Sequence, residues 1–241
     1  MAKIGFETFD RRGYPMVDAR SGYGEWAGTY EGTVEDEMDL ALLRRVTTVD
    51  WASADAVADL GCGTGRTGQW LHEQGARNID GVDVTPEMLE KARARDGVFR
   101  SLAVADARES GLASGAYPLA TSSLIDEHLA DVTPLYAEAA RLLRGGGSFV
   151  HVGFHPHFIM ASGMPTHYDG ADGPVAIETH VHHLSEQVTA GLAAGLQLAE
   201  MHERIIDDVW VELKPKWDRY RGQPITFALV WRKPDEPATA A

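Results

Sequence analysis

Short apolar runs of strand length alternate with segments of helical spacing along most of the chain. Strand-like runs cover residues 56–60 (AVADL), 79–84 (IDGVDV) and 100–105, a weaker run covers 117–122, and SFVHVGF covers 148–154. Turn residues and helix-like segments separate these runs, as they do when each strand of a parallel sheet is joined to the next by a helix. The pattern therefore predicts an α/β fold.

Start and stop signals mark the helices between these strands. Apolar residues spaced four apart predict one helix over residues 34–46. After the second strand, Thr85 can cap a helix and Pro86 suits its first position. Later in the chain, Ser185 is expected to cap another helix. Further helices are predicted over residues 65–74, 134–143 and 185–194.

The C-terminal part of the chain has a different pattern. Two closing strands are predicted over residues 196–207 and 225–233, and residues 234–241 are expected to form a disordered tail. Residues 158–177 contain prolines and several glycines and are expected to lack regular structure. We interpret them as an insertion that covers a substrate. Because no repeat or linker interrupts the chain, we predict one domain.

Composition narrows the class of protein. The 241 residues are 44% hydrophobic and 24% charged, and no apolar run approaches the length of a membrane helix. The net charge of -14 argues against a nucleic-acid partner, since such partners are bound mainly by clustered Lys and Arg. Cys62 is the only cysteine, which excludes an internal disulfide, and the first residues lack the pattern of a secretory signal. We therefore expect a cytoplasmic protein with no membrane partner.

The segment VADLGCGTGRTG (57–68) is the sharpest motif. A buried strand ends there in an acid and breaks into glycines, which let the backbone turn tightly and approach a ligand at the start of the next helix. The motif alone is weak evidence, because Gly63, Gly65 and Gly68 also match the GxGxxG spacing of dinucleotide enzymes. A nicotinamide-dependent oxidoreductase therefore remains an alternative.

Three acids at strand ends favour a different ligand. Asp59, just before the first glycine, would repel a pyrophosphate but attract the ammonium of an amino acid. Asp83, at the end of the second strand, can accept hydrogen bonds from both hydroxyls of a ribose. Asp106, after the third strand, can accept from the amino group of an adenine. An amino acid, a ribose and an adenine together describe S-adenosylmethionine.

The motifs DLGCGTGRTGQWL, GVDVTPEML, VADARE and ARLLRGGGSFVHVGF follow one another in this order. In this arrangement the chain resembles the class I S-adenosylmethionine-dependent methyltransferases, in particular the type 11 group that includes the ubiquinone and menaquinone methyltransferases. The resemblance covers about residues 20–233. One position departs from the family pattern, since Leu119 stands where relatives usually have an aspartate.

The resemblance implies a Rossmann-like α/β fold. Its seven-stranded sheet would have the order 3-2-1-4-5-7-6 with strand 7 antiparallel, helices on both faces, an N-terminal helical cap and an insertion after strand 5. The two adjacent strand-like runs at the C-terminus agree with this. The expected parts are an N-terminal cap (1–50), a cofactor-binding core (51–153), a substrate-covering insertion (154–183), a C-terminal helix with strands (184–233) and the tail (234–241).

The resemblance also assigns the cofactor, S-adenosylmethionine with S-adenosylhomocysteine as product, and the residues that would hold it. Asp59, Gly61 and Gly63 would bind the methionine part and Asp83 the ribose. The remaining predicted cofactor residues are Val84 and Met88 beside the adenine, Asp106 and Ala107 at its edge, Ser122 and Ser123 near the methionine amino group and sulfonium, and Tyr30 from the N-terminal cap.

Histidines supply the candidates for catalysis, and seven of the ten lie between His151 and His183. His155 and His157 follow the fifth strand, whose end faces the methyl group in this family, and could act as bases for a hydroxyl or azole acceptor. His128 follows the fourth strand and is a further candidate, whereas His151 is expected in the core. The predicted substrate-binding residues are His155, His157, Tyr23, Trp26, Met164, His167 and Tyr168.

A metal site is not expected. His155 with His157, and His180 with His182, have the H-x-H spacing that can place two imidazoles on one side of a strand, as zinc sites do. The metal-dependent relatives, however, use mainly carboxylate and amide oxygens around magnesium, and no such set aligns here.

The sequence thus predicts an enzyme that methylates an oxygen or nitrogen of a small molecule, acting as a monomer or homodimer. A nicotinamide oxidoreductase and a non-catalytic protein that binds S-adenosylmethionine are the alternatives.

Overall fold

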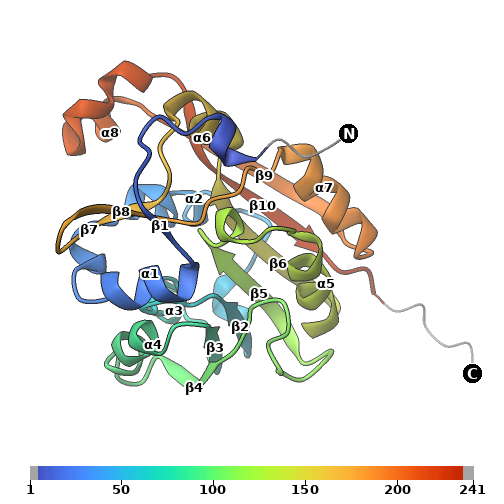
Figure 1. The fold of residues 1–241 in the computed structure, drawn as a ribbon. Coiled ribbons are helices and arrows are strands. Elements are labelled where there is room, and N and C mark those ends of the chain that lie inside the picture. Colours follow the sequence, from blue (N-terminus) through green and yellow to red (C-terminus); the bar gives the residue numbers. More distant parts are fainter. Residues whose placement is uncertain (1–4, 236–241) are drawn as a thin grey trace, which may run out of the picture.

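A seven-stranded sheet forms the centre of the protein, in the order β4-β3-β2-β5-β6-β10-β9 (Figure 1). The computed structural model describes residues 5–235. The strands β4, β3, β2, β5 and β6 are parallel, and β10 runs antiparallel to both of its neighbours, β6 and β9. The predicted order 3-2-1-4-5-7-6 with an antiparallel seventh strand is therefore confirmed. The strands are β2 (Val57–Leu60), β3 (Ile79–Asp83), β4 (Phe99–Val104), β5 (Tyr117–Ser123), β6 (Leu143–Phe154), β9 (Gln197–Ile205) and β10 (Pro224–Arg232).

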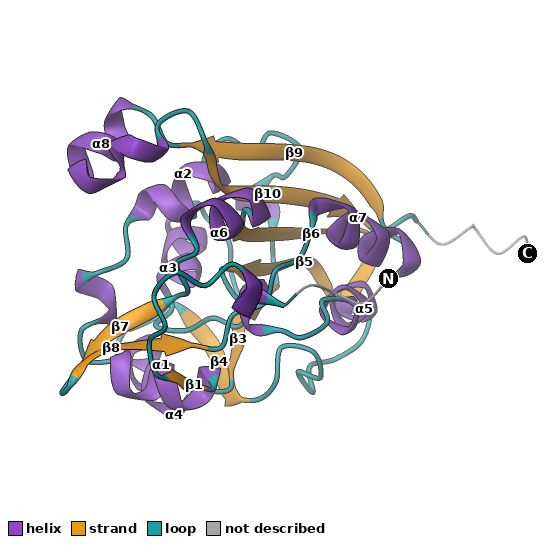
Figure 2. Cartoon of the chain, turned by 45° about the horizontal axis from the view of Figure 1, so that its top comes forward, coloured by secondary structure: helices purple, strands orange, loops and turns teal. Residues whose placement is uncertain are grey.

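Helices cover both faces of this sheet (Figure 2). On β6, Val150 and Val152 pack with α2 (Leu40–Leu43) and α3 (Arg66–Glu73). The alternate residue Phe149 packs with α5 (Thr133–Leu142) and α7 (Leu184–Ala193) on the other face. Because successive side chains of a strand point to opposite faces, strands buried on both sides read as the continuous apolar runs seen in the sequence. The helix α4 (Pro86–Arg93) packs along β3 and β4.

A cap covers the carboxyl ends of the parallel strands (Figure 1). Its centre is a second, three-stranded sheet in the order β1-β8-β7, which joins the N-terminal segment to the segment after β6. The cap elements are η1 (Phe6–Thr8), β1 (Met16–Val17), α1 (Ala19–Trp26), η2 (Tyr30–Gly32), η3 (Asp36–Met38), α6 (Pro156–Ser162), β7 (His167–Gly170), β8 (Gly173–Ile177), α8 (Asp208–Leu213) and η6 (Pro215–Tyr220); two further turns are η4 (Trp51–Ser53) and η5 (Asp126–His128).

Three local predictions were wrong. Residues 34–46 do not form one helix, because Asp39 has non-helical dihedral angles and caps α2 with its side chain, which separates α2 from η3. Residues 158–177 have regular structure, since α6 starts at Pro156 and β7 and β8 form a hairpin whose turn is at residues 171–172. The cap of α7 is His183 rather than Ser185.

The ends of the chain add two points. Most of the expected tail, residues 236–241, lies outside the described residues. Within residues 5–235, no helix is both long and apolar enough to cross a membrane.

Candidate functional site

The glycine loop between β2 and α3 turns as the motif requires. Gly61, Gly63 and Gly65 have φ angles of 71°, 53° and 81°, in the left-handed region that side chains disfavour. A Cβ atom on Gly61 would lie 2.7 Å from Cγ2 of Ile125, in the segment that follows β5. Only glycine therefore allows the loop to lie this close to the end of the neighbouring strand.

Asp83 is held beside this loop by backbone amides. Its Oδ2 accepts a hydrogen bond from Gly63 N at 2.9 Å, and its Oδ1 accepts one from Thr85 N at 2.8 Å. Burial raises the pKa of Asp83, and the two amide hydrogen bonds oppose that rise. The carboxylate is thus fixed between the loop and the first turn of α4.

Asp59 is a buried acid of the loop region with only one of its carboxylate oxygens hydrogen-bonded within residues 5–235. Its side chain is 1% exposed, and Oδ1 accepts a hydrogen bond from Thr121 Oγ1 at 3.0 Å. The other oxygen, Oδ2, is buried and has no hydrogen-bond partner within residues 5–235. Burial raises the pKa of Asp59 to about 7. A ligand ammonium would give this oxygen the partner that it lacks, so the residues fit the amino-acid end of the predicted cofactor.

The other predicted cofactor residues have different surroundings. Met88 lies near the loop, with its Cε 3.8 Å from the position of a Cβ on Gly63. The carboxylate of Asp106 is bound by its neighbour Arg108, whose hydrogen bonds lower the pKa of Asp106. The Ser122 hydroxyl lies in the core, 2.8 Å from His151 Nδ1, and Ser123 Oγ donates to Asp39 Oδ2 at 3.3 Å. Val84 is half-buried and Ala107 is buried. Their cofactor roles stay predictions.

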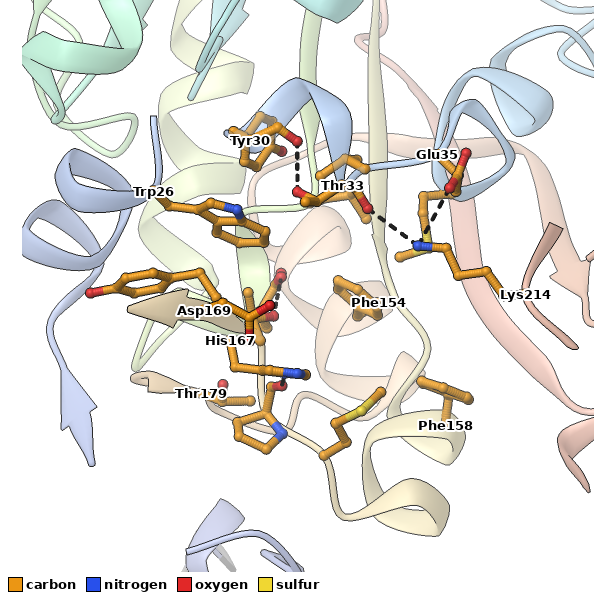
Figure 3. Close-up of a pocket in the computed structure, with 18 of the residues that line it drawn as sticks. Trp26, Tyr30, Thr33, Glu35, Phe154, Phe158, His167, Asp169, Thr179 and Lys214 are labelled. Atoms are coloured by element: carbon orange, nitrogen blue, oxygen red, sulfur yellow. Dashed lines mark hydrogen bonds and ion pairs between the residues drawn. The ribbon is translucent and has the colours of Figure 1, made fainter. Parts of the chain in front are cut away.

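A cavity of about 640 Å³ lies between the cap and the ends of the strands. Figure 3 shows Trp26, Phe154 and Phe158 pointing into it from three separate elements. Trp26 and Tyr168 are stacked with ring centroids 6.0 Å apart. Of the predicted substrate-binding and cap residues, the structure brings to this cavity Tyr23, Trp26, Tyr30, Met164, His167 and Tyr168.

His155 and His157 lie elsewhere. His155 caps α6 by accepting a hydrogen bond from His157 N at Nδ1, and its Nε2 lies 2.9 Å from Glu203 Oε1 on β9. Because Nδ1 accepts, Nε2 carries the proton and donates to Glu203. Neither imidazole lines the cavity. Their predicted catalytic and substrate-binding roles therefore have no geometric support.

His128 lies close to the cavity wall, but both of its ring nitrogens already have hydrogen-bond partners. Its Nδ1 is 2.7 Å from the carbonyl oxygen of Glu178, which can only accept, so Nδ1 carries the proton. Its Nε2 then accepts from the Tyr23 hydroxyl at 2.9 Å. Burial lowers the pKa of His128 to about 4, so the ring is neutral at pH 7. This arrangement ties α1 to η5 and to the strand-to-helix connection at Glu178.

Glu127, which precedes His128, was not among the residues predicted from the sequence. Its side chain is 2% exposed and lines the cavity. Oε1 accepts a long hydrogen bond from Thr166 Oγ1 at 3.4 Å, whereas Oε2 is buried and finds no hydrogen-bond partner in the described part of the chain. Burial, with the charge of Asp126 beside it, raises the pKa of Glu127 well above its usual value. Its position just after β5, where this fold places its ligands, was the available signal.

A buried polar network holds the turn that carries Glu127. Asp126 Oδ2 accepts from Gln187 Nε2 at 2.7 Å and lies 3.8 Å from His151 Nε2. Burial raises the pKa of Asp126, but the polar groups around it, chiefly the nearby imidazole of His151, outweigh burial, and the pKa of this carboxyl is lowered. Leu124, where the chain leaves β5, has a φ of 56°, which is rare for a leucine and marks a constrained turn.

No group of three or more His, Cys, Asp or Glu that could hold a metal ion occurs among residues 5–235. The rings of His180 and His182 lie 6.4 Å apart, and His182 Nε2 is 2.6 Å from the carbonyl oxygen of Leu129. His151 is completely buried, as expected.

Comparison with known proteins identifies the core. Residues 58–151 match the type 11 family model that is described as a methyltransferase domain. Residues 58–151 form a methyltransferase domain of this family. This confirms the resemblance that the motifs indicated. The methyltransferase domain includes the glycine loop, Asp83 and the turn with Glu127, whereas the cap lies outside it.

Individual relatives are more distant. Over 127 residues the chain is 30% identical to a malonyl-[acyl-carrier protein] O-methyltransferase of Salmonella typhimurium, a stretch that covers 52% of this chain and 49% of that protein. The chain spans about half or less of the length of the curated relatives that it matches.

Solved structures share the fold over most of the chain. An S-adenosylmethionine-dependent methyltransferase of Mesorhizobium loti is 23% identical, with a TM-score of 0.66 over 82% of this chain and 98% of that one. The [4+2]-cyclase SpnF is 15% identical, with a TM-score of 0.65 over 93% of this chain and 100% of that one. At these identities the likeness establishes the fold alone.

Proposed function

We propose that this protein is an S-adenosylmethionine-dependent methyltransferase that methylates an oxygen or nitrogen of a small molecule bound in the cavity. One observation carries the proposal: the glycine loop and the cavity share a wall. This wall is the segment 124–127. Gly61 approaches Ile125 of the segment closely, and Leu124 and Glu127 of the same segment line the cavity. A cofactor on the loop and an acceptor in the cavity would therefore be neighbours, which is the main requirement for methyl transfer.

The loop residues fit the cofactor chemically. The free oxygen of Asp59 suits the ammonium of the methionine part, and Asp83 has acceptor capacity left for ribose hydroxyls. When bound, S-adenosylmethionine supplies a methyl group on a sulfonium that is already a good leaving group. The protein's own tasks are then to bind, align and exclude water.

The cavity supports a small organic acceptor. Its volume of about 640 Å³ is within the usual range for small-molecule sites, and its wall is rich in aromatic rings. The net charge of -14 opposes an approach by nucleic acid.

The alternatives are weighed by specific observations. The methyltransferase family match disfavours a nicotinamide-dependent oxidoreductase. The likeness to a protein described as a [4+2]-cyclase supports keeping a role without methyl transfer as an outcome of the test, because the fold by itself does not define the reaction.

The test has two stages. In the first, S-adenosylhomocysteine and NADH are added separately while the melting temperature is followed. We expect only S-adenosylhomocysteine to raise the melting temperature. At 100 times its Kd, such a ligand stabilises the folded protein by about 2.7 kcal/mol. Stabilisation by NADH alone would refute the proposal.

In the second stage, release of S-adenosylhomocysteine from S-adenosylmethionine is measured across a panel of small phenols, carboxylic acids and amines. Acceptor-dependent release supports a methyltransferase. Tight cofactor binding without turnover of any acceptor would favour a non-catalytic role.

A further inference from the structure

We propose that the acceptor is a small amine with a flat apolar body, and that the carboxyl group of Glu127 binds its nitrogen. This inference rests on the proposed function and names the substrate class of the same cavity.

The first argument is the free oxygen of Glu127. The side chain is 2% exposed and lines the cavity, and its Oε2 has no hydrogen-bond partner among residues 5–235. A buried polar atom without a partner is costly, and such atoms in a native structure call for an explanation. A ligand that donates a hydrogen bond from within the cavity would remove this cost. An ammonium is the strongest such donor for a carboxylate.

The second argument is the set of aromatic rings near this carboxyl. Trp26 stacks with Tyr23, at 5.8 Å between centroids, and with Tyr168, at 6.0 Å. Tyr30 meets Trp26 edge to face at 5.0 Å. All four residues line the cavity. Ring faces attract cations and stack on flat apolar groups, so these rings suit both parts of an aromatic amine.

The cations of the cavity do not favour an acidic acceptor. Lys214 Nζ lies 3.4 Å from Glu35 Oε1 and donates to the carbonyl oxygen of Thr33 at 3.2 Å, so its charge is already partnered (Figure 3). Lys216 is exposed at the surface. The long-range field of a protein with net charge -14 also draws cations and repels anions.

Glu127 would also have a chemical role. An ammonium has no lone pair and must lose a proton before it can be methylated, and the Glu127 carboxylate can take that proton. The nitrogen lone pair then forms the new bond to the methyl carbon, while the electron pair of the carbon–sulfur bond stays on sulfur. The turn that carries this carboxyl is held at Asp126, which accepts a hydrogen bond from Gln187 and lies 3.8 Å from His151.

The test measures binding of three probes of nearly equal shape: 2-phenylethylamine, 2-phenylethanol and phenylacetate. Each is titrated into the 241-residue chain saturated with S-adenosylhomocysteine, and binding is followed by calorimetry and by intrinsic tryptophan fluorescence. We expect the amine to bind at least tenfold more tightly than the alcohol or the acid. The preference is measured on the unmodified protein, so it does not depend on a variant that folds.

Glu127→Gln keeps the shape of the side chain and removes its charge. It should weaken amine binding at least tenfold and leave alcohol and S-adenosylhomocysteine binding within twofold. Glu212→Gln, at an exposed position of α8, changes the net charge equally and should alter neither affinity.

Three results would overturn the inference: alcohol or acid binding as tight as amine binding, no amine binding at all, or an amine preference that Glu127→Gln leaves unchanged. Failure of S-adenosylhomocysteine to bind in the same samples would instead refute the proposed function, so the two failures are distinguishable.

Discussion

The two halves of the candidate site are built in different ways. The cofactor side comes from the ends of the adjacent strands β2 and β3, where Asp83 Oδ2 lies 2.9 Å from Gly63 N. The cavity side is enclosed by segments from the whole length of the chain, including Tyr30, Glu127, Tyr168 and Trp217. The first half depends on local backbone geometry and the second on long-range packing. Changes in one half should therefore leave the function of the other largely intact.

Asp59→Asn should separate the functions of the two halves most clearly, because it should weaken cofactor binding alone. The amide cannot neutralise a ligand ammonium, so binding of S-adenosylhomocysteine should weaken by about 3 kcal/mol, roughly a hundredfold. Calorimetry measures this loss. Binding of 2-phenylethylamine, added without cofactor, should be unaffected, and a parallel loss of amine affinity would contradict the division of the site into two halves.

The pH dependence of stability should show the free-energy cost of ionising the buried carboxyl of Asp59. Its pKa is raised from 3.8 to about 7 in the folded protein, so the folded state holds a proton that the unfolded state releases. Asp59 therefore stabilises the folded state most below pH 4, and this stabilisation is lost as the pH rises towards 7, by about 4 kcal/mol in total. Urea unfolding of the ligand-free protein measures the slope.

Asp59→Asn, which cannot ionise, should flatten that slope between pH 4 and pH 7. The same slope in both proteins would show that Asp59 ionises without cost, and would remove the argument for a ligand ammonium at this position.

Gly61→Ala tests the shared wall. The new methyl group would meet Ile125 at 2.7 Å, on a backbone with a φ of 71°. We expect a loss of about 1–3 kcal/mol in the free energy of unfolding. Gly97→Ala is the control, since Gly97 has a similar φ of 75° and nothing within 4 Å of the added atom. Equal losses would mean that backbone strain alone, and not contact with Ile125, accounts for the effect.

The smallest effect is expected from Tyr23→Phe, which removes the hydrogen bond to His128 Nε2. Loss of one buried hydrogen bond should cost about 1 kcal/mol, measured by urea unfolding at pH 7.5. Tyr220→Phe in η6 is the matched control. S-adenosylhomocysteine binding should stay within threefold in both, and a larger loss in Tyr23→Phe alone would show that the cap also holds the cofactor.

The glycine loop, Asp59 and Asp83 could be assigned from the sequence because each lies at a strand end whose place in the sheet follows from the order of the motifs. The aromatic cap residues Tyr23, Trp26 and Tyr30 were also noticed, since their spacing gathers them on one side of a short helix. Glu127 was not predicted to line the cavity, and His155 was predicted to face the acceptor although it does not line the cavity, for one reason. Sequence position tells which strand end a residue follows but not which way the chain turns next, and at Leu124 an unusual φ decides that turn.

The sequence by itself determined the strands and the tight loop, because these depend on apolar runs that must be buried on both faces and on backbone freedom at glycines. The order of the strands was implied by the resemblance to the family. Only the tertiary structure decided which acids and histidines reach the cavity. His155 pairs with Glu203 on β9 and His128 with Tyr23 of the cap, whereas one oxygen of Glu127 has no hydrogen-bond partner between residues 5 and 235. Those partners come from distant parts of the chain, so their contacts exist only once the cap has packed onto the sheet.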